Sequence, residues 1–472
     1  MTKAPVTLLW LRRDLRLSDH PALTAACAQG VVIPVFIRDD LVDGLGAAPK
    51  FRLNLALEHL SARLAQVGSR LILRSGPALA ALSDLIQETG ADAVFWSRNF
   101  DPAFVARDTA VKSGLKSRGI SARSFSGQLL FEPHTVQTGQ GGPYRVYSPF
   151  WRAVQSRQPG APLPAPRTIP APDKWPASEH LADWQLSASM NRGAEVLRPH
   201  QRVGETAALD RLAWFRDTAM QLYKTRRDRL AEDGTSGLSQ NLALGEVSAR
   251  QCWAAAQDRW HQGCSGAETY LKELVWREFS YHLAHHTPRM LTDNWREGWD
   301  RFPWRTDPGA PEVIAWKQGR TGIPVVDAAM RQMYVTGQMH NRARMIVASF
   351  LTKHLMTHWR IGQDWFSECL TDWDPAANAM GWQWVAGSGP DAAPFFRIFN
   401  PETQAKTHDP EGAYVKTWLA EGQDCPPQTA LAFFQAVPRS WNILPNDRYP
   451  APIIPLPEGR KRAVSAYEAR DF

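Results

Sequence analysis

An aspartate, an asparagine and a tryptophan are spaced so that they could build one ligand site. Asp374 is followed by Pro375, and this pair predicts a helix start, because Asp caps free amides and Pro at the first helical position needs no amide partner. Asn378 and Trp382 are four residues apart and therefore share a helix face. A short amide beside a large indole suits a buried planar ligand with a polar edge. A core helix whose asparagine is satisfied internally fits the same pattern.

A small, hydroxyl-rich loop is a second candidate. It reads Gly234-Thr235-Ser236-Gly237-Leu238-Ser239. Successive backbone amides and hydroxyls of such a loop can surround a phosphate. An ordinary turn has the same composition, so the loop alone leaves both interpretations open.

Two expected helices also carry residues of chemical interest. Tyr270, Glu273 and Arg277 step by three and four and share a face, and Trp276 adjoins it. A carboxylate, an arginine and two aromatic rings on one face would be unusual in a core, although a solvated, salt-bridged face is the alternative.

The second of these helices begins after His340. Asn341 and Met345 are four residues apart, with Arg342 and Arg344 beside them. The residues alone fit equally a basic helix start with a buried methionine.

The elements that position these residues fall into two classes. Short apolar runs predict buried strands at Val6–Leu11, Val31–Ile37, Arg70–Leu73, Ala91–Trp96 and Ala122–Phe125. Helical patterns separate them, at Phe51–Gln66, Pro77–Glu88 and Phe104–Lys116. This alternation predicts an α/β domain, residues 1–131, with a five-stranded parallel sheet covered by helices on both faces.

The turn after the first expected strand reads Arg12-Arg13-Asp14-Leu15-Arg16. It lacks the glycines of a pyrophosphate-binding turn, which argues against a standard dinucleotide-binding domain. Each arginine, taken alone, is interpreted as a surface charge.

A change in composition follows. Seven prolines lie between Pro159 and Pro176, so residues 132–204 are expected to form a long, semi-extended linker. From residue 205 to 472 apolar residues recur at three- and four-residue steps, which predicts an all-helical domain. The expected helices are Ala207–Tyr223, Ser248–His261, Ala267–His285, Ile323–Val335, Asn341–Trp359 and Trp365–Leu370.

Composition adds modest constraints. The chain has 472 residues, a net charge of +7 and 20 tryptophans, and a basic protein favours a polyanionic partner. Five scattered cysteines with no metal-ligand spacing indicate a reducing compartment and no metal site. With no signal peptide and no apolar run long enough for a membrane span, we expect a cytoplasmic, bacterial protein, monomeric because nothing suggests a large self-association surface.

The stretch from Asp372 to Asn400 resembles the flavin-binding core of the DNA photolyase and cryptochrome family. It carries Asp-x-Asp-x-x-x-Asn-x-x-Gly-Trp-Gln-Trp and then Arg-Ile-Phe-Asn-Pro. The resemblance covers nearly the whole chain, most strongly from Gly234 to Pro401. It implies non-covalent FAD in the helical domain. It also implies an antenna chromophore in the α/β domain, with methenyltetrahydrofolate favoured and a deazaflavin as the alternative.

Matched residue by residue, the resemblance assigns three groups of side chains. The residues implied to bind FAD are Tyr223, Thr235, Ser236, Gly237, Leu238, Ser239, Tyr270, Arg277, Arg344, Asp372, Asp374 and Asn378. Those implied to contact DNA or the damaged bases are Arg227, Glu273, Trp276, Asn341, Arg342, Met345 and Trp384. Trp382, Trp359 and Trp304 match an electron relay, and Glu273 and Asn378 are implied to take part in catalysis.

The implied activity is light-driven repair of cyclobutane pyrimidine dimers in UV-damaged DNA, by electron transfer from reduced FAD to a flipped-out dimer. Two alternatives remain. A signalling cryptochrome is disfavoured by Asn378, where plant cryptochromes usually carry Asp, and by the short C-terminus. A (6-4) photolyase is disfavoured because His340 is followed by Asn341 and not by a second histidine. The sequence departs from the commoner pattern at Gln338, Tyr270 and Trp373.

Overall fold

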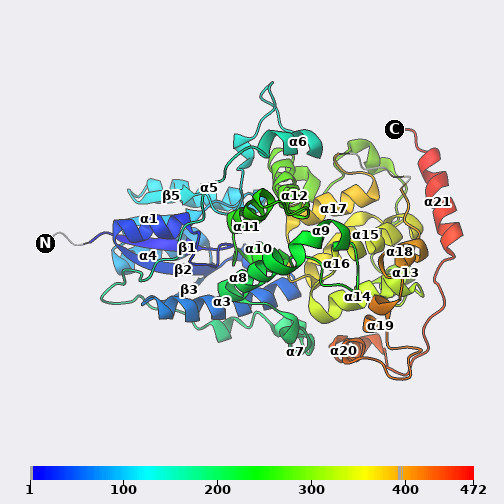
Figure 1. Ribbon diagram of the computed structural model, residues 1–472. Coiled ribbons are helices and arrows are strands. Elements are labelled where there is room, and N and C mark those ends of the chain that lie inside the picture. Colours follow the sequence, from blue (N-terminus) through cyan, green and yellow to red (C-terminus); the bar gives the residue numbers. More distant parts are fainter. Residues whose placement is uncertain (1–3, 392–394, 396) are drawn as a thin grey trace.

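The computed structural model describes residues 4–391, 395 and 397–472, and it places five parallel strands at one end of the molecule (Figure 1). The strands are β1 (Val6–Leu11), β2 (Val31–Arg38), β3 (Ile72–Ser75), β4 (Ala93–Ser97) and β5 (Ser121–Phe125). Their order is β3-β2-β1-β4-β5 and every pairing is parallel. The predicted sheet is confirmed, with β3 shifted toward the C-terminus by two residues.

Helices cover both faces of this sheet, as predicted. Leu9 and Leu11 of β1 pack in one cluster with α1 (Pro21–Gln29) and α3 (Ala47–Gln66). Leu8 and Trp10, which alternate with them, pack on the opposite face with α4 (Ala78–Thr89) and α5 (Pro102–Lys116). The two-residue period of a strand accounts for this division. A short helix, α2 (Asp40–Asp43), follows β2.

The turn after β1 lies inside the molecule, so the interpretation of its arginines as surface charges is wrong. Arg12 and Arg16 are 5% and 1% exposed. The guanidinium of Arg16 donates to the carbonyls of Gly245 (2.9 Å) and Gly127 (3.0 Å). The partners are more than 100 residues away in sequence, which is why local sequence cannot reveal the burial. The turn sits between β1 and β4, where the strand order reverses.

The segment between the sheet and the main helical region is mostly irregular. It contains α6 (Tyr147–Val154) and the short α7 (Gly193–Leu197). Residues 155–180, which hold the proline run, form neither helix nor strand. The linker expected over residues 132–204 stays a prediction.

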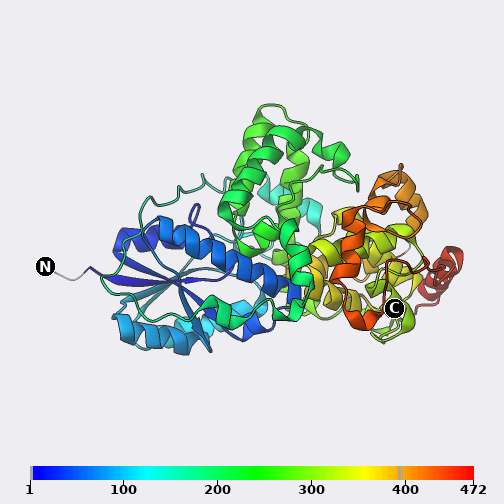
Figure 2. The same cartoon turned by 90° about the horizontal axis from the view of Figure 1, so that it is seen from below.

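The rest of the chain is helical, apart from one isolated bridge between Arg305 and Thr357 in the part that the structure describes. Figure 2 shows this half beside the sheet, with α21 at its far edge. Its helices are α8 (Gly204–Trp214), α9 (Tyr223–Arg226), α10 (Ser239–Leu244), α11 (Ala249–His261), α12 (Ala267–His286), α13 (Pro311–Lys317), α14 (Pro324–Thr336), α15 (Asn341–Ser349), α16 (Trp359–Cys369), α17 (Pro375–Ala386), α18 (Pro401–His408), α19 (Ala413–Trp418), α20 (Gln428–Ala436) and α21 (Leu456–Glu468).

Two of the predicted helices are interrupted. The one expected over Ala207–Tyr223 changes to a π-helical turn at Phe215–Ala219. The one expected over Asn341–Trp359 ends after a π-helical turn at Phe350–His354, and Trp359 begins α16. Met356 has a φ of 54°, a left-handed conformation that ends helical geometry. Apolar periodicity continues through the break because both sides face one core.

Two apolar clusters build the helical half. One gathers side chains of α14, α15, α16 and α17. The other gathers α11 and α12, but it also includes Phe131, Tyr147 and Phe150 from the preceding segment. Helices α12 and α17 pack against each other. The candidate site therefore forms where the two clusters meet.

Glu278 fastens the segment after β5 to α12. It is fully buried and accepts hydrogen bonds from the backbone amides of Leu130 (2.7 Å) and Phe131 (3.0 Å). Arg277 donates to its other oxygen at 3.1 Å. Burial raises the pKa of Glu278 to about 7, and the nearby Arg277 and the two amides only partly oppose that rise.

This carboxyl makes stability depend on pH. The pKa of Glu278 in the folded protein lies above the roughly 4.3 of an exposed glutamate. The stabilising contribution of this carboxyl is therefore fully present below about pH 4.3 and is lost as pH rises through 7. Glu278→Gln keeps one acceptor oxygen and removes the titration. Between pH 5 and 7.5 the unfolding free energy of wild type should fall relative to the variant, by up to about 3 kcal/mol.

Urea unfolding at stepped pH measures this difference. Glu268→Gln is the control, because Glu268 lies on the same helix and its side chain is 47% exposed. Parallel pH profiles for wild type and Glu278→Gln would contradict the prediction.

Candidate functional site

The start of α17 positions the asparagine and tryptophan as the spacing predicted. Asp374 is the N-cap, and its carboxylate accepts the amide of Ala377 at 3.0 Å. Asn378 and Trp382 are both buried. The side-chain nitrogen of Asn378 donates to the backbone carbonyl of Asp374 at 2.9 Å. Its carbonyl oxygen is therefore the group left to accept a hydrogen bond from a ligand.

An ion pair joins α15 to the segment before α17. Arg344 donates from Nη2 to Asp372 Oδ2 at 2.7 Å, and its Nε donates to the carbonyl of Met339 at 2.9 Å. Asp372 is 6% exposed, and its Oδ1 is buried without a protein partner. The resemblance implies that both residues bind FAD, and the geometry brings them together across 28 positions of sequence.

An arginine that the sequence analysis missed bonds to the backbone of the hydroxyl-rich loop. Arg211 on α8 donates to the carbonyls of Ser236 (2.7 Å) and Thr235 (2.9 Å) and pairs with Asp233. Gly237 has a φ of +62°, which favours glycine. With its carbonyls turned to Arg211, the loop keeps a fixed shape. No local spacing links Arg211 to the loop.

Residues around the loop pack closely together. Leu238 is fully buried, and Ser239 begins α10. The rings of Tyr223 and Tyr270 meet edge to face with centroids 5.6 Å apart. These tyrosines and the loop thus belong to one packed unit.

The residues predicted to meet damaged bases form a second group, on α12. Glu273 pairs with Arg227, which follows α9. Trp276 stacks against Tyr147 of α6, with centroids 3.6 Å apart and planes inclined by 5°. The hydroxyl of Tyr147 donates to the carbonyl of Lys272 at 2.7 Å. The sequence analysis missed Tyr147, which lies in the segment interpreted as a linker.

The remaining predicted DNA contacts lie on α15 and α17. Asn341 is exposed, whereas Met345 and Trp384 are partly buried. Arg342 pairs with Asp228 at 2.8 Å, so part of its charge is neutralised. Arg397 lies over the ring of Trp384, at 5.9 Å from the centroid.

The three tryptophans matched to an electron relay lie in neighbouring elements. Trp304 and His358 are in ring contact at 5.2 Å, and His358 contacts Trp359 at 5.4 Å. Trp382 lies against α16, where a Cβ on Gly362 would come within 2.1 Å of its ring. A side chain at position 362 would clash with the Trp382 ring. The glycine therefore allows Trp382 to pack against the turn of α16 that follows Trp359.

Arg277 and Asp374 belong to a buried polar network between the two halves of the chain. Arg277 donates to the carbonyl of Gln128 at 3.2 Å. Asp374 accepts from the hydroxyl of Tyr281 at 2.7 Å and pairs with Arg13 at 3.3 Å. Burial favours a higher pKa for Asp374, but Arg13 and Arg277 outweigh it and lower the pKa. Asp374 is thus ionised and structurally engaged, while its predicted contact with FAD stays a prediction.

Comparisons with known proteins decide the family. A model described as DNA photolyase matches residues 7–168, and one described as the FAD binding domain of DNA photolyase matches residues 270–469. The deoxyribodipyrimidine photo-lyase of Agrobacterium fabrum is 46% identical over 99% of this chain and 98% of its own length. The chain belongs to the DNA photolyase family.

Other relatives include both photolyases and a cryptochrome. The deoxyribodipyrimidine photo-lyase of Escherichia coli is 35% identical, with 98% of both chains covered. Cryptochrome-2 of Arabidopsis thaliana is 34% identical over 88% of this chain and 70% of its own. The crystal structure of a bacterial class III photolyase from Agrobacterium tumefaciens superposes with a TM-score of 0.91 at 45% identity, covering 99% of this chain and 98% of that one. The predicted family and fold are confirmed.

The residues present fit FAD in this photolyase. The buried Oδ1 of Asp372 and Nε1 of Trp382 have no protein partner. Gly381 lies one turn from Asn378, and a Cβ added there would meet no atom within 4 Å. The unpartnered buried atoms of Asp372 and Trp382, together with the bare backbone face at Gly381, are features that a planar ring with polar edges would complete.

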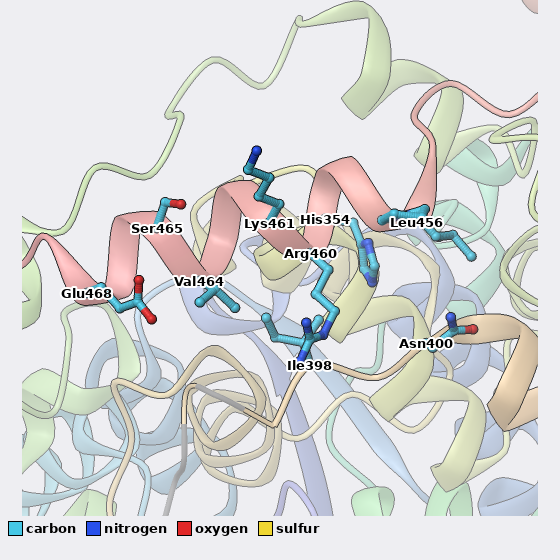
Figure 3. Close-up of a pocket in the computed structure, with 10 residues that line it drawn as sticks. His354, Ile398, Asn400, Leu456, Arg460, Lys461, Val464, Ser465 and Glu468 are labelled. Carbon is cyan, nitrogen blue, oxygen red and sulfur yellow. The ribbon is translucent and has the colours of Figure 1, made fainter.

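A separate groove lies at the edge of the photolyase fold. It has a volume of about 540 Å³, and Figure 3 shows α21 along one side with Ile398 and Asn400 opposite. Arg460, Lys461 and Glu468 also line it. None of the residues predicted to bind FAD or DNA is among its lining residues.

The tryptophan relay can be tested on its own. In Trp382→Phe, photoreduction of oxidised FAD should be slowed at least tenfold, because phenylalanine is much harder to oxidise than an indole. Repair by chemically reduced protein should be nearly unchanged. Absorption spectra under continuous illumination give the rate.

Trp316→Phe is the matched control, since Trp316 is buried and meets Trp382 edge to face at 6.1 Å. It should photoreduce as fast as wild type. A wild-type rate in Trp382→Phe would instead show that another indole, such as Trp373, supplies the electron.

Proposed function

We propose that this protein is a light-dependent repair enzyme for cyclobutane pyrimidine dimers in DNA. One observation carries the proposal. Helix α12 presents Tyr270 and Arg277, matched to flavin contacts, within two turns of Glu273 and Trp276, matched to lesion contacts. A single helix thus brings cofactor and damaged bases to one place. The names of the photolyase relatives support the same substrate.

Bound reduced FAD supplies light absorption and one-electron donation. Arg344 and Asp372 would hold its ring system, and the Gly234–Ser239 loop would hold its pyrophosphate. The Asn378 oxygen accepts a hydrogen bond at the ring edge and has no proton of its own to give. The protein itself contributes by positioning the cofactor and the substrate and by providing electrostatic stabilisation.

The Arg227–Glu273 ion pair has a part in substrate binding. A DNA phosphate competes for Arg227, and the released Glu273 carboxylate can then accept a hydrogen bond from a pyrimidine edge. Exclusion of water strengthens this hydrogen bond and so helps to position the base. The dimer reaches this place by leaving the duplex, as in other base-flipping enzymes, and the basic surface supplies affinity without sequence preference.

Several finer assignments accompany the proposal. An antenna chromophore in the α/β half extends light absorption, with methenyltetrahydrofolate preferred over a deazaflavin. The enzyme acts as a monomer on UV-damaged DNA in a bacterial cytoplasm. In the described residues no helix has the length and apolar character for a membrane span. A cryptochrome role is second in rank, since Cryptochrome-2 aligns over most of the chain and fold alone does not fix function.

Illumination of reduced protein with oligonucleotides that carry one defined lesion tests the function. The cyclobutane dimer should disappear in light and persist in the dark, and the (6-4) lesion should persist in both. Disappearance of the (6-4) lesion alone would assign the third activity. Persistence of both lesions would leave the photoreceptor role.

Asn378 provides a second test. Asn378→Asp places a proton donor where wild type has a neutral amide, so chemically reduced flavin should return to the oxidised form in air at least several-fold faster. Repair should fall by a larger factor than DNA affinity. Absorption spectra during re-oxidation give the rate.

Asn400→Asp is a suitable control. It also adds a carboxylate to the helical half, and its retained oxygen can still cap α18 by accepting the amide of Thr403, which Asn400 accepts at 3.1 Å. If Asn378→Asp holds its reduced flavin as long as wild type, Asn378 is a packing residue.

A further inference from the structure

Arg13, in the turn after β1, makes three bonds to three separate parts of the chain. Its Nε donates to the carbonyl of Ala243 at 2.8 Å. Its Nη1 pairs with Asp101 at 2.8 Å, and its Nη2 pairs with Asp374 at 3.3 Å. The side chain is 12% exposed. Each of the three guanidinium nitrogens of Arg13 therefore has a protein partner.

These partners belong to both sides of the proposed flavin site. Ala243 lies in α10, the helix that begins at the end of the Gly234–Ser239 loop. Asp374 is the N-cap of α17, which carries Asn378 and Trp382. Asp101 precedes α5 in the α/β half. A single charged group from the sheet domain thus connects the phosphate side of the site to the ring side.

The turn has no freedom to move away from α10. Gly245 follows α10 with a φ of +69°, and a Cβ there would come within 2.1 Å of the Arg13 carbonyl oxygen. The amide of Leu15 also donates to the carbonyl of Leu244 at 3.1 Å. Arg13 therefore starts from a backbone that is fixed against the helical half.

From Arg13 the contacts run directly to the asparagine. Arg13 and the Tyr281 hydroxyl both engage Asp374 Oδ2. This leaves Oδ1 of the same carboxylate to cap Ala377, and the Asp374 carbonyl accepts the Asn378 amide. Loss of Arg13 would leave the buried Asp374 and Asp101 carboxylates close together with less compensation, which is costly.

We propose that Arg13 is a positioning residue of the FAD site, through which the sheet domain sets the separation of α10 and α17 and the orientation of the Asn378 amide. The proposal rests on the flavin site proposed above and not on the identity of the lesion. The arginine does not touch the reacting atoms; it acts through Asp374 and Ala243.

The test compares Arg13→Met with Arg12→Met. Both changes remove a buried guanidinium from the same turn, but Arg12 bonds Asp108 and the carbonyl of Ser97, within the α/β half. Apoprotein titrated with FAD should show that Arg13→Met weakens binding at least about tenfold, because a buried ion-pair partner is lost. Its reduced flavin should also re-oxidise faster in air. Arg12→Met should stay within about twofold of wild type in both measurements.

Asp374→Asn checks the route. Asparagine is a good N-cap, so this variant is expected to fold even where Arg13→Met does not, and it alone should weaken FAD binding and shorten the life of the reduced flavin. If Arg13 acts through Asp374, the FAD affinity of the double variant should lie within about twofold of that of Arg13→Met. Independent losses of affinity would instead add.

Three outcomes would each overturn the proposal. They are wild-type FAD affinity and re-oxidation in Arg13→Met, equal losses of both in Arg12→Met, and additive losses of FAD affinity in the double variant. None of these measurements uses DNA, so absence of dimer repair would refute the proposed function and leave this result standing.

Discussion

Charge buried between the two halves of the chain is the constraint on which the structure depends. Arg52 of α3 pairs with Glu246 just after α10, and both are almost completely buried. Glu205, at the start of α8, accepts the backbone amide of Leu17 at 2.9 Å. A buried charge without its partner costs several kcal/mol, so these pairs permit only one placement of the sheet against the helices. A site assembled from α10, α12, α15 and α17 needs such a fixed placement.

Local sequence predicts those parts of the fold that depend on local physics. The five strands follow from apolar runs, and the start of α17 follows from the Asp374-Pro375 pair, which caps a helix by its own chemistry. The break at Met356 could not be predicted, because its cause is a left-handed residue inside an otherwise continuous apolar pattern. The boundary at β3 shifted for another reason, because pairing with Val35–Arg38 of β2, and not composition, decides where this strand begins and ends.

The candidate site likewise contains residues that local sequence predicts and residues that it does not. Spacing places Asn378 and Trp382 on one face, and the resemblance assigns Arg344 and Asp372 to the same ligand. Arg211 and Arg13 were missed or misinterpreted because their partners are distant in sequence; Arg13 and Asp374 are 361 positions apart. An arginine that bonds backbone carbonyls leaves no pattern of neighbouring charges, so only three-dimensional proximity reveals it.

The stacking of Tyr147 on Trp276 has a consequence for how this chain can be divided. Tyr147, Phe150 and Trp151 of α6 belong to the same apolar cluster as α11 and α12. A polypeptide cut near residue 205 would match the change in composition, yet it would expose one face of Trp276 and leave that cluster unfilled. The packed unit is therefore larger than the unit that composition marks, because α6 packs with the helical half although the proline run separates them in sequence.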